Sequence, residues 1–294
     1  MPLHIHIIPS NATPDRLSNY GGGCFAGLPT RSSFKKAIKR GEIFINGEPG
    51  TTGSIIHPGY KIEWHEPEKK PGKLFHIHLD IIYADDHLVV VNKPAGVVVS
   101  GNQFRTLENA IPVYLGPSTL PGALPSPRAI HRLDAATSGL IIMARTSQSR
   151  AALGHQMEEK SIQKHYHTVV IGNPPASGKI NEAIDERPAV TTFEKICAVP
   201  SLRSSTLSLL KASPVTGRTH QIRKHLASQG WPVLGDKLYG KEGLIMRGKG
   251  LFLCATEVCF IHPQTGEKMH FQIEMPAKFE RFMKGEKQRF FKTK

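Results

Sequence analysis

The sequence predicts an α+β protein with one small N-terminal domain and one larger domain. The chain has 294 residues, enough for a well-buried core and a second unit. A stretch rich in Pro, Lys and Glu, EPEKKPGK at residues 66–73, is typical of a solvated linker. On both sides of it, short apolar runs predict strands and apolar residues at helical spacing predict helices. We therefore expect a small α/β domain at residues 1–66, a linker at residues 67–75 and a second domain at residues 76–294.

The charge balance favours a polyanionic partner. The chain has 38 Lys and Arg against 24 Asp and Glu, a formal net charge of +14. Such an excess is typical of proteins that bind nucleic acid, although a basic enzyme without such a partner remains an alternative. No apolar stretch approaches the ~20 residues that a membrane-spanning helix needs, so we expect no membrane partner.

The cysteines and histidines predict no metal site. The four cysteines have no paired CxxC spacing, which argues against both zinc and a disulfide framework. Free thiols are typical of a reducing compartment, and the N-terminus, MPLHIHIIPSNATPDRL, does not have the pattern of a secretory signal. The 15 histidines are scattered without three ligands close together. We therefore expect a cytoplasmic monomer with no metal and no cofactor.

The small domain is organised around one basic helix. Thr30 is a suitable N-cap for this helix and Gly41 a natural end. Its helical spacing gathers four basic residues on one side. These candidate RNA-binding residues are Lys35, Lys36, Lys39 and Arg40. A short strand and an Asn46-Gly47 turn follow, which predicts a hairpin.

The centre of the large domain is the stretch HRLDAATSGLIIMART, residues 131–146. It brings together a base, a cation and a carboxylate, His131, Arg132 and Asp134, just before an apolar run typical of a buried strand. A carboxylate held at the edge of such a strand is well placed to react. An isolated Asp–Arg pair, however, is more often structural, so the residues alone leave both interpretations open.

This stretch resembles the signature of the RluA branch of pseudouridine synthases, in which HRLD is followed after two residues by Thr-Ser-Gly-Leu. The resemblance implies that Asp134 is the catalytic carboxylate and that Arg132 helps to extrude the target uridine. His131, beside them, is a candidate for substrate contact. Three further elements match the family in its order. They are Lys-Pro-x-Gly at residues 93–96, Lys-x-Tyr at residues 164–166 and Gly-Arg-Thr-His-Gln-Ile-Arg at residues 217–223.

The matching positions inherit the family's roles. The resemblance implies that Lys93 and Pro94 shape the floor of the active site and that Tyr166 lines the uracil pocket. It also implies that Arg223 pairs with the catalytic carboxylate, and we expect this pair to use the bidentate fork of the guanidinium. Two neighbours in the same basic segment, Arg218 and His220, are further candidates for substrate contact.

Two expectations about structure accompany these roles. Thr219 is a suitable N-cap for the helix that carries Ile222 and Leu226 inward. The family resemblance implies a mostly antiparallel sheet in the large domain, with the active site in a basic cleft. The small domain, over residues 30–65, resembles the S-four-type RNA-binding module in its order of basic helix, Gly, strand, Asn-Gly, Pro-Gly and final strand.

The implied reaction is the isomerisation of uridine in RNA, in which uracil leaves through ring nitrogen 1 and rejoins the sugar through ring carbon 5. No atoms enter or leave, which fits the lack of a cofactor motif. We expect large-subunit ribosomal RNA as the target, with transfer RNA as the alternative. A catalytically silent RNA-binding protein is a rival, but the intact set of Asp134, Tyr166 and Arg223 argues against it. A hydrolase using His131 and Asp134 is another rival, and it lacks an assignable metal cluster or activated nucleophile.

Overall fold

The chain divides into two units, Met1–Gly72 and Lys73–Lys294. The computed structural model describes residues 3–67, 74–245 and 248–293. Most of the predicted linker, residues 67–75, lies outside the described residues. Its last residue belongs to the large unit instead, because the N–H of Phe75 donates to the carbonyl of Asn109 at 3.0 Å and its ring packs on the core there.

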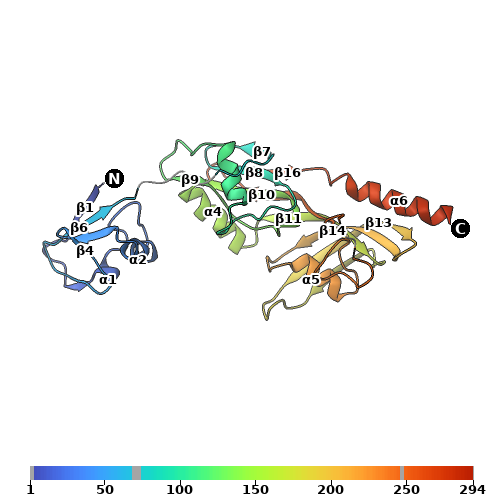
Figure 1. Ribbon diagram of the computed structural model, residues 1–294, viewed down its shortest axis with the longest axis horizontal. Helices are drawn as coiled ribbons and strands as arrows, with labels where there is room; N and C mark the ends of the chain where they lie inside the picture. Colours follow the sequence, from blue (N-terminus) through green and yellow to red (C-terminus); the bar gives the residue numbers. More distant parts are fainter. Residues whose placement is uncertain (1–2, 68–73, 246–247, 294) are drawn as a thin grey trace. The chain divides into compact units, whose positions relative to one another are not determined.

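The N-terminal unit packs one main helix on a four-stranded sheet of order β1-β6-β3-β4, beside a small β2-β5 pair (Figure 1). Its elements are β1 (Leu3–Ile7), β2 (Asp15–Arg16), α1 (Leu17–Tyr20), α2 (Arg31–Lys39), β3 (Ile43–Ile45), β4 (Glu48–Pro49), β5 (Ile55–Ile56) and β6 (Lys61–His65). Helix α2 begins at its predicted cap: the hydroxyl of Thr30 accepts from the N–H of Ser33 at 3.1 Å, within a capping box. Asn46 and Gly47 have φ of 50° and 86°, as a two-residue type I′ hairpin requires.

The apolar face of α2 holds this unit together. Phe34, Ala37 and Ile38 are buried in one cluster with Trp64 of β6. Burying this face leaves the opposite side of α2 in solvent, and Lys36 and Lys39 are exposed there.

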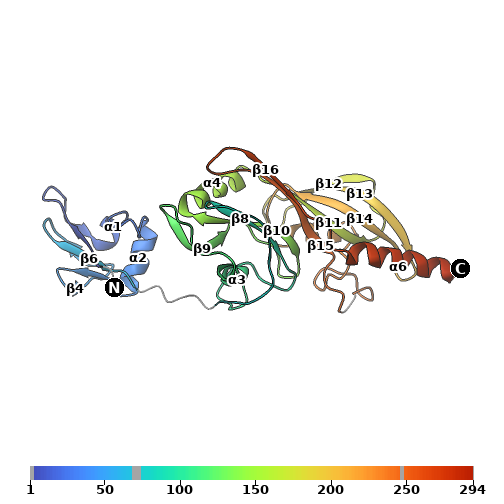
Figure 2. The same cartoon turned by 90° about the horizontal axis from the view of Figure 1, so that it is seen from above.

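The large unit is built on a ten-stranded sheet of order β12-β13-β14-β11-β15-β10-β8-β7, with β16 beside β15 and β9 beside β10 (Figures 1 and 2). Its strands are β7 (Asp80–Ala84), β8 (Leu88–Lys93), β9 (Ala123–Ala129), β10 (Ser138–Thr146), β11 (Gln163–Ile171), β12 (Ser177–Asn181), β13 (Val190–Ser201), β14 (Ser205–Pro214), β15 (Leu253–Ile261) and β16 (Lys268–Gln272). Its helices are α3 (Leu107–Ala110), η1 (Ile111–Val113), α4 (Ser147–Glu158), α5 (Gln221–Ser228) and α6 (Lys278–Lys292). Neighbouring strands run antiparallel except β10 and β15, which run parallel. The α+β fold with a mostly antiparallel sheet is therefore confirmed.

Helices cover both faces of this sheet, which explains the continuous apolar run of β10. Leu140 and Ile142 pack in one cluster with Leu153 of α4. Ile141 and Met143 point to the other face and share a cluster with α3 and η1. Because both faces are buried, the strand shows no alternation of apolar and polar residues.

The other half of the sheet is covered in the same way by α5 and α6. Leu226 of α5 shares a cluster with Val170, while Phe279 of α6 shares one with Val169 on the opposite face. Figure 2 shows α6 lying along the end of the sheet near β13. The basic C-terminal segment is thus a docked amphipathic helix. No helix among the described residues is long and apolar enough to span a membrane.

The parallel contact between β10 and β15 requires glycine at position 139. Gly139 has φ of 116°, and a Cβ there would lie 2.1 Å from the carbonyl oxygen of Ala255. Gly139→Ala should therefore lower the free energy of unfolding by about 3 kcal/mol or more, because both backbone conformation and space oppose a side chain.

Gly154→Ala is the matched control for this prediction. Gly154 lies within α4, and a Cβ there meets nothing within 4 Å. This change should stabilise the protein by roughly 0.5–1 kcal/mol through helix propensity. Chemical denaturation of both variants measures the difference, and equal stability of the two would contradict the steric argument.

Candidate active site

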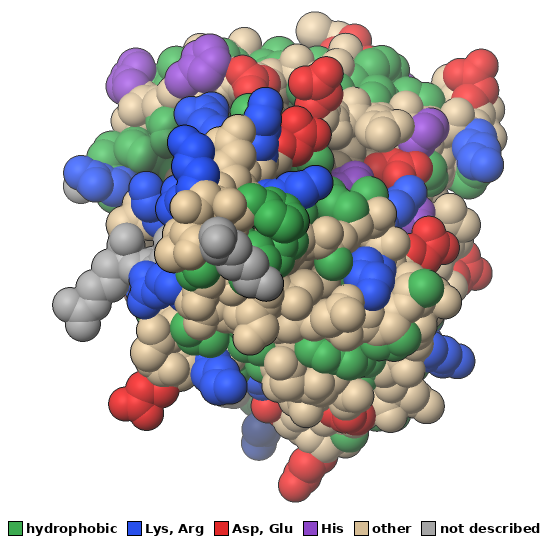
Figure 3. Space-filling view, turned by 90° about the vertical axis from the view of Figure 1, so that its right-hand side faces the viewer, with side chains coloured by type: hydrophobic (Ala, Val, Ile, Leu, Met, Phe, Trp, Pro, Cys, Tyr) green, Lys and Arg blue, Asp and Glu red, His purple; other side chains and the backbone are tan. Residues whose placement is uncertain are grey.

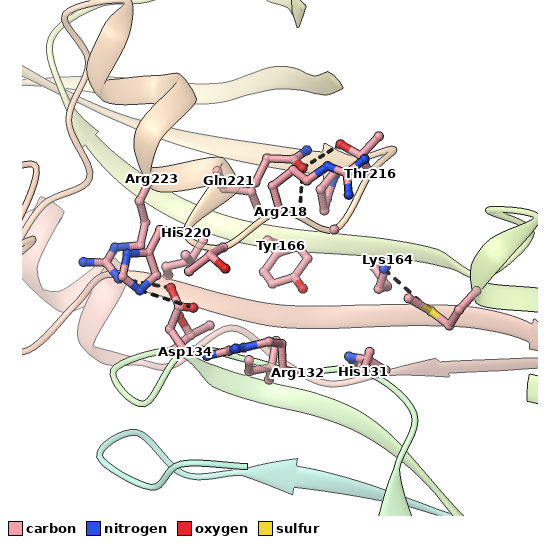
Figure 4. Close-up of a pocket in the computed structure, with 18 residues that line it drawn as sticks. His131, Arg132, Asp134, Lys164, Tyr166, Thr216, Arg218, His220, Gln221 and Arg223 are labelled. Atoms are coloured by element: carbon pink, nitrogen blue, oxygen red, sulfur yellow. Dashed lines mark hydrogen bonds and ion pairs between the residues drawn. The ribbon is translucent and has the colours of Figure 1, made fainter. Parts of the chain in front are cut away.

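A cavity of about 200 Å³ lies where the segment before β10, strand β11 and the start of α5 meet. Its lining includes residues from three of the four elements that resemble the family, at residues 131–134, 164–166 and 217–223. Among them are His131, Arg132, Asp134, Lys164, Tyr166, Arg218, His220 and Arg223 (Figure 4). The fold therefore brings together residues from distant parts of the chain, from His131 to Leu253.

Arg223 links two carboxylates. Its Nη1 donates to Asp134 Oδ2 at 3.0 Å, while its Nε and Nη2 donate to the two oxygens of Asp236 at 2.7 and 2.8 Å. The expectation of a bidentate grip on Asp134 was therefore wrong, because the fork is occupied by Asp236. Only one guanidinium N–H bond orients Asp134, and Asp236 orients the guanidinium.

Asp236 is the residue that sequence reasoning missed, although it lies in the Gly-Asp-x-x-Tyr-Gly string at residues 235–240. Its side chain is fully buried, and burial alone would raise its pKa. Bonds from Arg223 and from the N–H groups of Leu238 and Tyr239 outweigh burial, so the pKa of Asp236 is lowered. Asp236 is thus a permanent anion beneath Arg223.

His220 and Tyr239 complete this side of the site. His220 has φ of 57° and serves as the N-cap position of α5, so the prediction of Thr219 as the cap was wrong. The ring of His220 bonds to the hydroxyl of Tyr239 at 2.9 Å and its Nε2 lies 3.7 Å from Asp134 Oδ1. Burial lowers the pKa of His220 more than the charge of Asp134 raises it, which favours the neutral ring at pH 7.

Tyr166 lies across the cavity on β11, opposite Ala255 of β15. Its ring is nearly buried, and burial together with the nearby charge of Asp134 raises the pKa of its hydroxyl. The phenol therefore stays protonated and offers a flat apolar face with a neutral hydroxyl. In Figure 4 the ring lies between the Asp134–Arg223 pair and Lys164, whose pKa is lowered by burial.

Lys93 and Pro94 lie outside the cavity lining. Lys93 is fully buried and its Nζ donates to the carbonyls of Pro94, Val97 and Ala135 at 2.9, 2.7 and 3.3 Å. Burial lowers its pKa to about 8, against the opposing attraction of Asp134. Lys93 therefore links two loops, one of which carries Asp134. All three N–H groups of its ammonium are used in these bonds, so none is left for a substrate.

The remaining candidates for substrate contact are Arg132, Arg218 and His131, and they differ in whether their polar groups are free to reach a substrate. Arg132 is exposed and lines the cavity, and Arg218 lines it while its Nε donates to the carbonyl of Pro188 at 3.3 Å. His131 Nε2 instead accepts the N–H of Ile142 at 3.2 Å, and burial lowers its pKa to about 3. With its lone pair occupied, His131 cannot serve as the base that the hydrolase interpretation requires.

Comparisons with known proteins agree with this geometry. Residues 87–228 match the family model described as RNA pseudouridylate synthase. An uncharacterized RNA pseudouridine synthase of Aquifex aeolicus is 33% identical over 276 residues, covering 85% of this chain and 87% of its own length. The ribosomal large subunit pseudouridine synthase D of Neisseria meningitidis serogroup A is 33% identical and covers 84% of this chain and 72% of its own. The dual-specificity RNA pseudouridine synthase RluA of Haemophilus influenzae is 37% identical over 211 residues, with coverage of 66% and 92%.

The fold has solved counterparts as well. The structure of human RNA pseudouridylate synthase domain containing 1 superposes with a TM-score of 0.56 at 23% identity, covering 71% of this chain and 86% of that one. The chain belongs to the RluA branch of the RNA pseudouridine synthase family and is an isomerase that acts on RNA.

His131 predicts how stability depends on pH. The unfolded chain binds a proton at this ring near pH 6.5, while the folded protein binds it only near pH 3. Stability from this group is therefore complete above pH 6.5 and is lost as pH falls below it, by about 1.4 kcal/mol per pH unit at most.

His131→Gln retains an acceptor for the N–H of Ile142 but cannot titrate. Between pH 7 and pH 5 the wild type should lose up to about 2 kcal/mol more unfolding free energy than this variant. Urea titrations at the two pH values measure this difference. Parallel losses in both proteins would show that the ring is not held neutral.

Proposed function

We propose that the protein isomerises specific uridines in large-subunit ribosomal RNA, with Asp134 as the catalytic carboxylate. The observation that supports this most is the position of Asp134. It lies at the edge of the cavity and is held by Arg223, opposite the ring of Tyr166. The guanidinium bond limits the rotation of the carboxylate.

The proposed chemistry breaks the bond between sugar C1′ and uracil N1 and forms a bond between C1′ and C5. The proton on C5 is lost and N1 gains one, so the product is an isomer. An ordered carboxylate serves each route to this exchange, whether it attacks the sugar, attacks the ring or takes a sugar proton. Tyr166 stacks on the uracil, and the exposed Arg132 contacts the RNA at the position that the extruded base leaves.

Both carboxylates, the arginine and the tyrosine come from one chain, which is consistent with a monomer. The four free cysteines are consistent with the reducing cytoplasm. For the target, the support comes from the relatives, several of which are named ribosomal large subunit pseudouridine synthase D. Transfer RNA is the second candidate target, and the name of the Haemophilus influenzae relative, dual-specificity RNA pseudouridine synthase, indicates that a member of this family acts on more than one target.

For the N-terminal unit we propose a role in RNA binding. A shallow surface hollow on α2 is lined by Arg31, Ser32, Lys35, Lys36 and Lys39. Arg40 does not line this hollow, and its guanidinium pairs with the largely buried Glu42. Figure 3 instead faces the large unit at the end of α6, where Lys and Arg side chains also gather toward one side, in keeping with a polyanionic partner.

Asp134→Asn should abolish pseudouridine formation while leaving the fold intact, because an amide cannot act as an anionic nucleophile or base. The measurement is pseudouridine mapping of ribosomal and transfer RNA in cells lacking the gene, complemented with wild type or variant. Asp185→Asn, an identical change at an exposed carboxylate, is the control and should restore the modification.

Two outcomes would overturn the proposal in different ways. Full restoration by Asp134→Asn would remove this carboxylate from the mechanism. A site that depends on the gene in transfer RNA alone would replace the proposed target.

Reversing the charges of Lys35, Lys36 and Lys39 to Glu should weaken RNA binding across sequences. Each lost phosphate contact lowers the slope of log K against log salt by about one unit. Replacing the same three residues by Arg preserves the charge and should preserve the slope. Salt titrations of RNA binding measure this slope. An unchanged slope in the Glu variant would show that these three lysines do not contact phosphate.

A further inference from the structure

We propose that Glu257, Cys259 and His270 form a binding site for one transition-metal ion of the zinc class. The three side chains lie on β15 and β16 and take no part in lining the catalytic cavity. Their ligand atoms, a carboxylate oxygen, a sulfur and an imidazole nitrogen, all lie within 4.8 Å of one another.

Strand geometry explains this convergence. Glu257 and Cys259 are two residues apart on β15, so they point to the same face of the sheet. His270 is the direct cross-strand partner of Cys259 on β16. Its Nε2 already lies 3.0 Å from Glu257 Oε1, so small side-chain rotations bring all three atoms onto one ion.

The donor set selects the class of ion. Thiolate, imidazole and carboxylate together are typical of zinc, whereas magnesium and calcium prefer oxygen ligands throughout. Thiolate and carboxylate supply two negative charges, which balance a divalent cation. Three protein ligands leave the fourth tetrahedral position to water, and the half-exposed ring of His270 gives the ion access.

The surroundings tune this site. Lys211 donates to the other oxygen of Glu257 at 2.8 Å, which orients the carboxylate and leaves Oε1 for the ion. Lys211 and Lys268 are cationic groups that interact with these ligands, and their charges oppose the bound cation.

A bound ion would fasten β16, which pairs with β15, to the body of the sheet. The sequence alone does not predict this site. Its spacing, Glu-x-Cys with a histidine eleven positions later, matches no common zinc motif. The three ligands converge only once β15 and β16 are paired.

Cobalt(II) titration of the full-length protein, under a phosphine reductant and without chelator, tests the proposal. The wild type should develop thiolate-to-cobalt charge-transfer absorption that saturates at one equivalent and is reversed by one equivalent of zinc. Cys259→Ser should lose the band, and His270→Asn should need at least about tenfold more cobalt. Cys197→Ser, which removes an exposed thiol elsewhere, should behave as the wild type.

Thermal unfolding supplies the second measurement. Zinc should raise the Tm of the wild type and of Cys197→Ser but not that of Cys259→Ser. Absence of the charge-transfer band in the wild type, or its persistence in Cys259→Ser, would overturn the site. An equal zinc-induced Tm shift in all three proteins would overturn it too.

Discussion

The candidate catalytic site depends on one buried guanidinium that is shared by two carboxylates. Arg223 is only 6% exposed, and a cation so buried would be strongly destabilising without a partner. Asp236 neutralises it through two short bonds and also accepts the N–H groups of the turn that follows. The third nitrogen, Nη1, donates to Asp134.

Each member of this group belongs to a different part of the fold. Asp134 precedes β10, Arg223 is on α5 and Asp236 follows α5. The position of Asp134 depends on contacts outside the cavity. Lys93 bonds to the carbonyl of Ala135, and Gly139 allows β10 to approach β15. The sheet and its helices therefore fix the distances between the loop of Asp134, helix α5 and the loop of Asp236.

The sequence predicted local features well because their causes are local. The cap at Thr30 and the Asn46-Gly47 hairpin follow from turn and capping chemistry that neighbouring residues supply. The predicted cap at Thr219 failed because His220 adopts a left-handed conformation that directs its ring toward Asp134 and Tyr239. A tertiary contact overrode a local preference at that position.

The family resemblance predicted some of the site residues, but the sequence could not predict which side chains bond to one another there. The resemblance brought Asp134, Tyr166 and Arg223 to attention, but a pairing needs three-dimensional positions. Nothing in the string around Asp236 indicates that it occupies the fork of Arg223. The resemblance likewise implied that Lys93 shapes the floor of the active site, whereas its buried ammonium group donates to backbone carbonyls.

The central claim is that Asp236 acts on catalysis mainly by holding the guanidinium of Arg223. A double-mutant cycle tests it most directly, with kcat/KM for pseudouridine formation measured for Arg223→Lys, Asp236→Asn and the double variant. Thermal unfolding of each protein separates rate effects from loss of fold. A lysine cannot use the planar fork, so Asp236→Asn should cost at least about tenfold in the wild type and little in the Arg223→Lys background. Equal losses in both backgrounds would contradict the account.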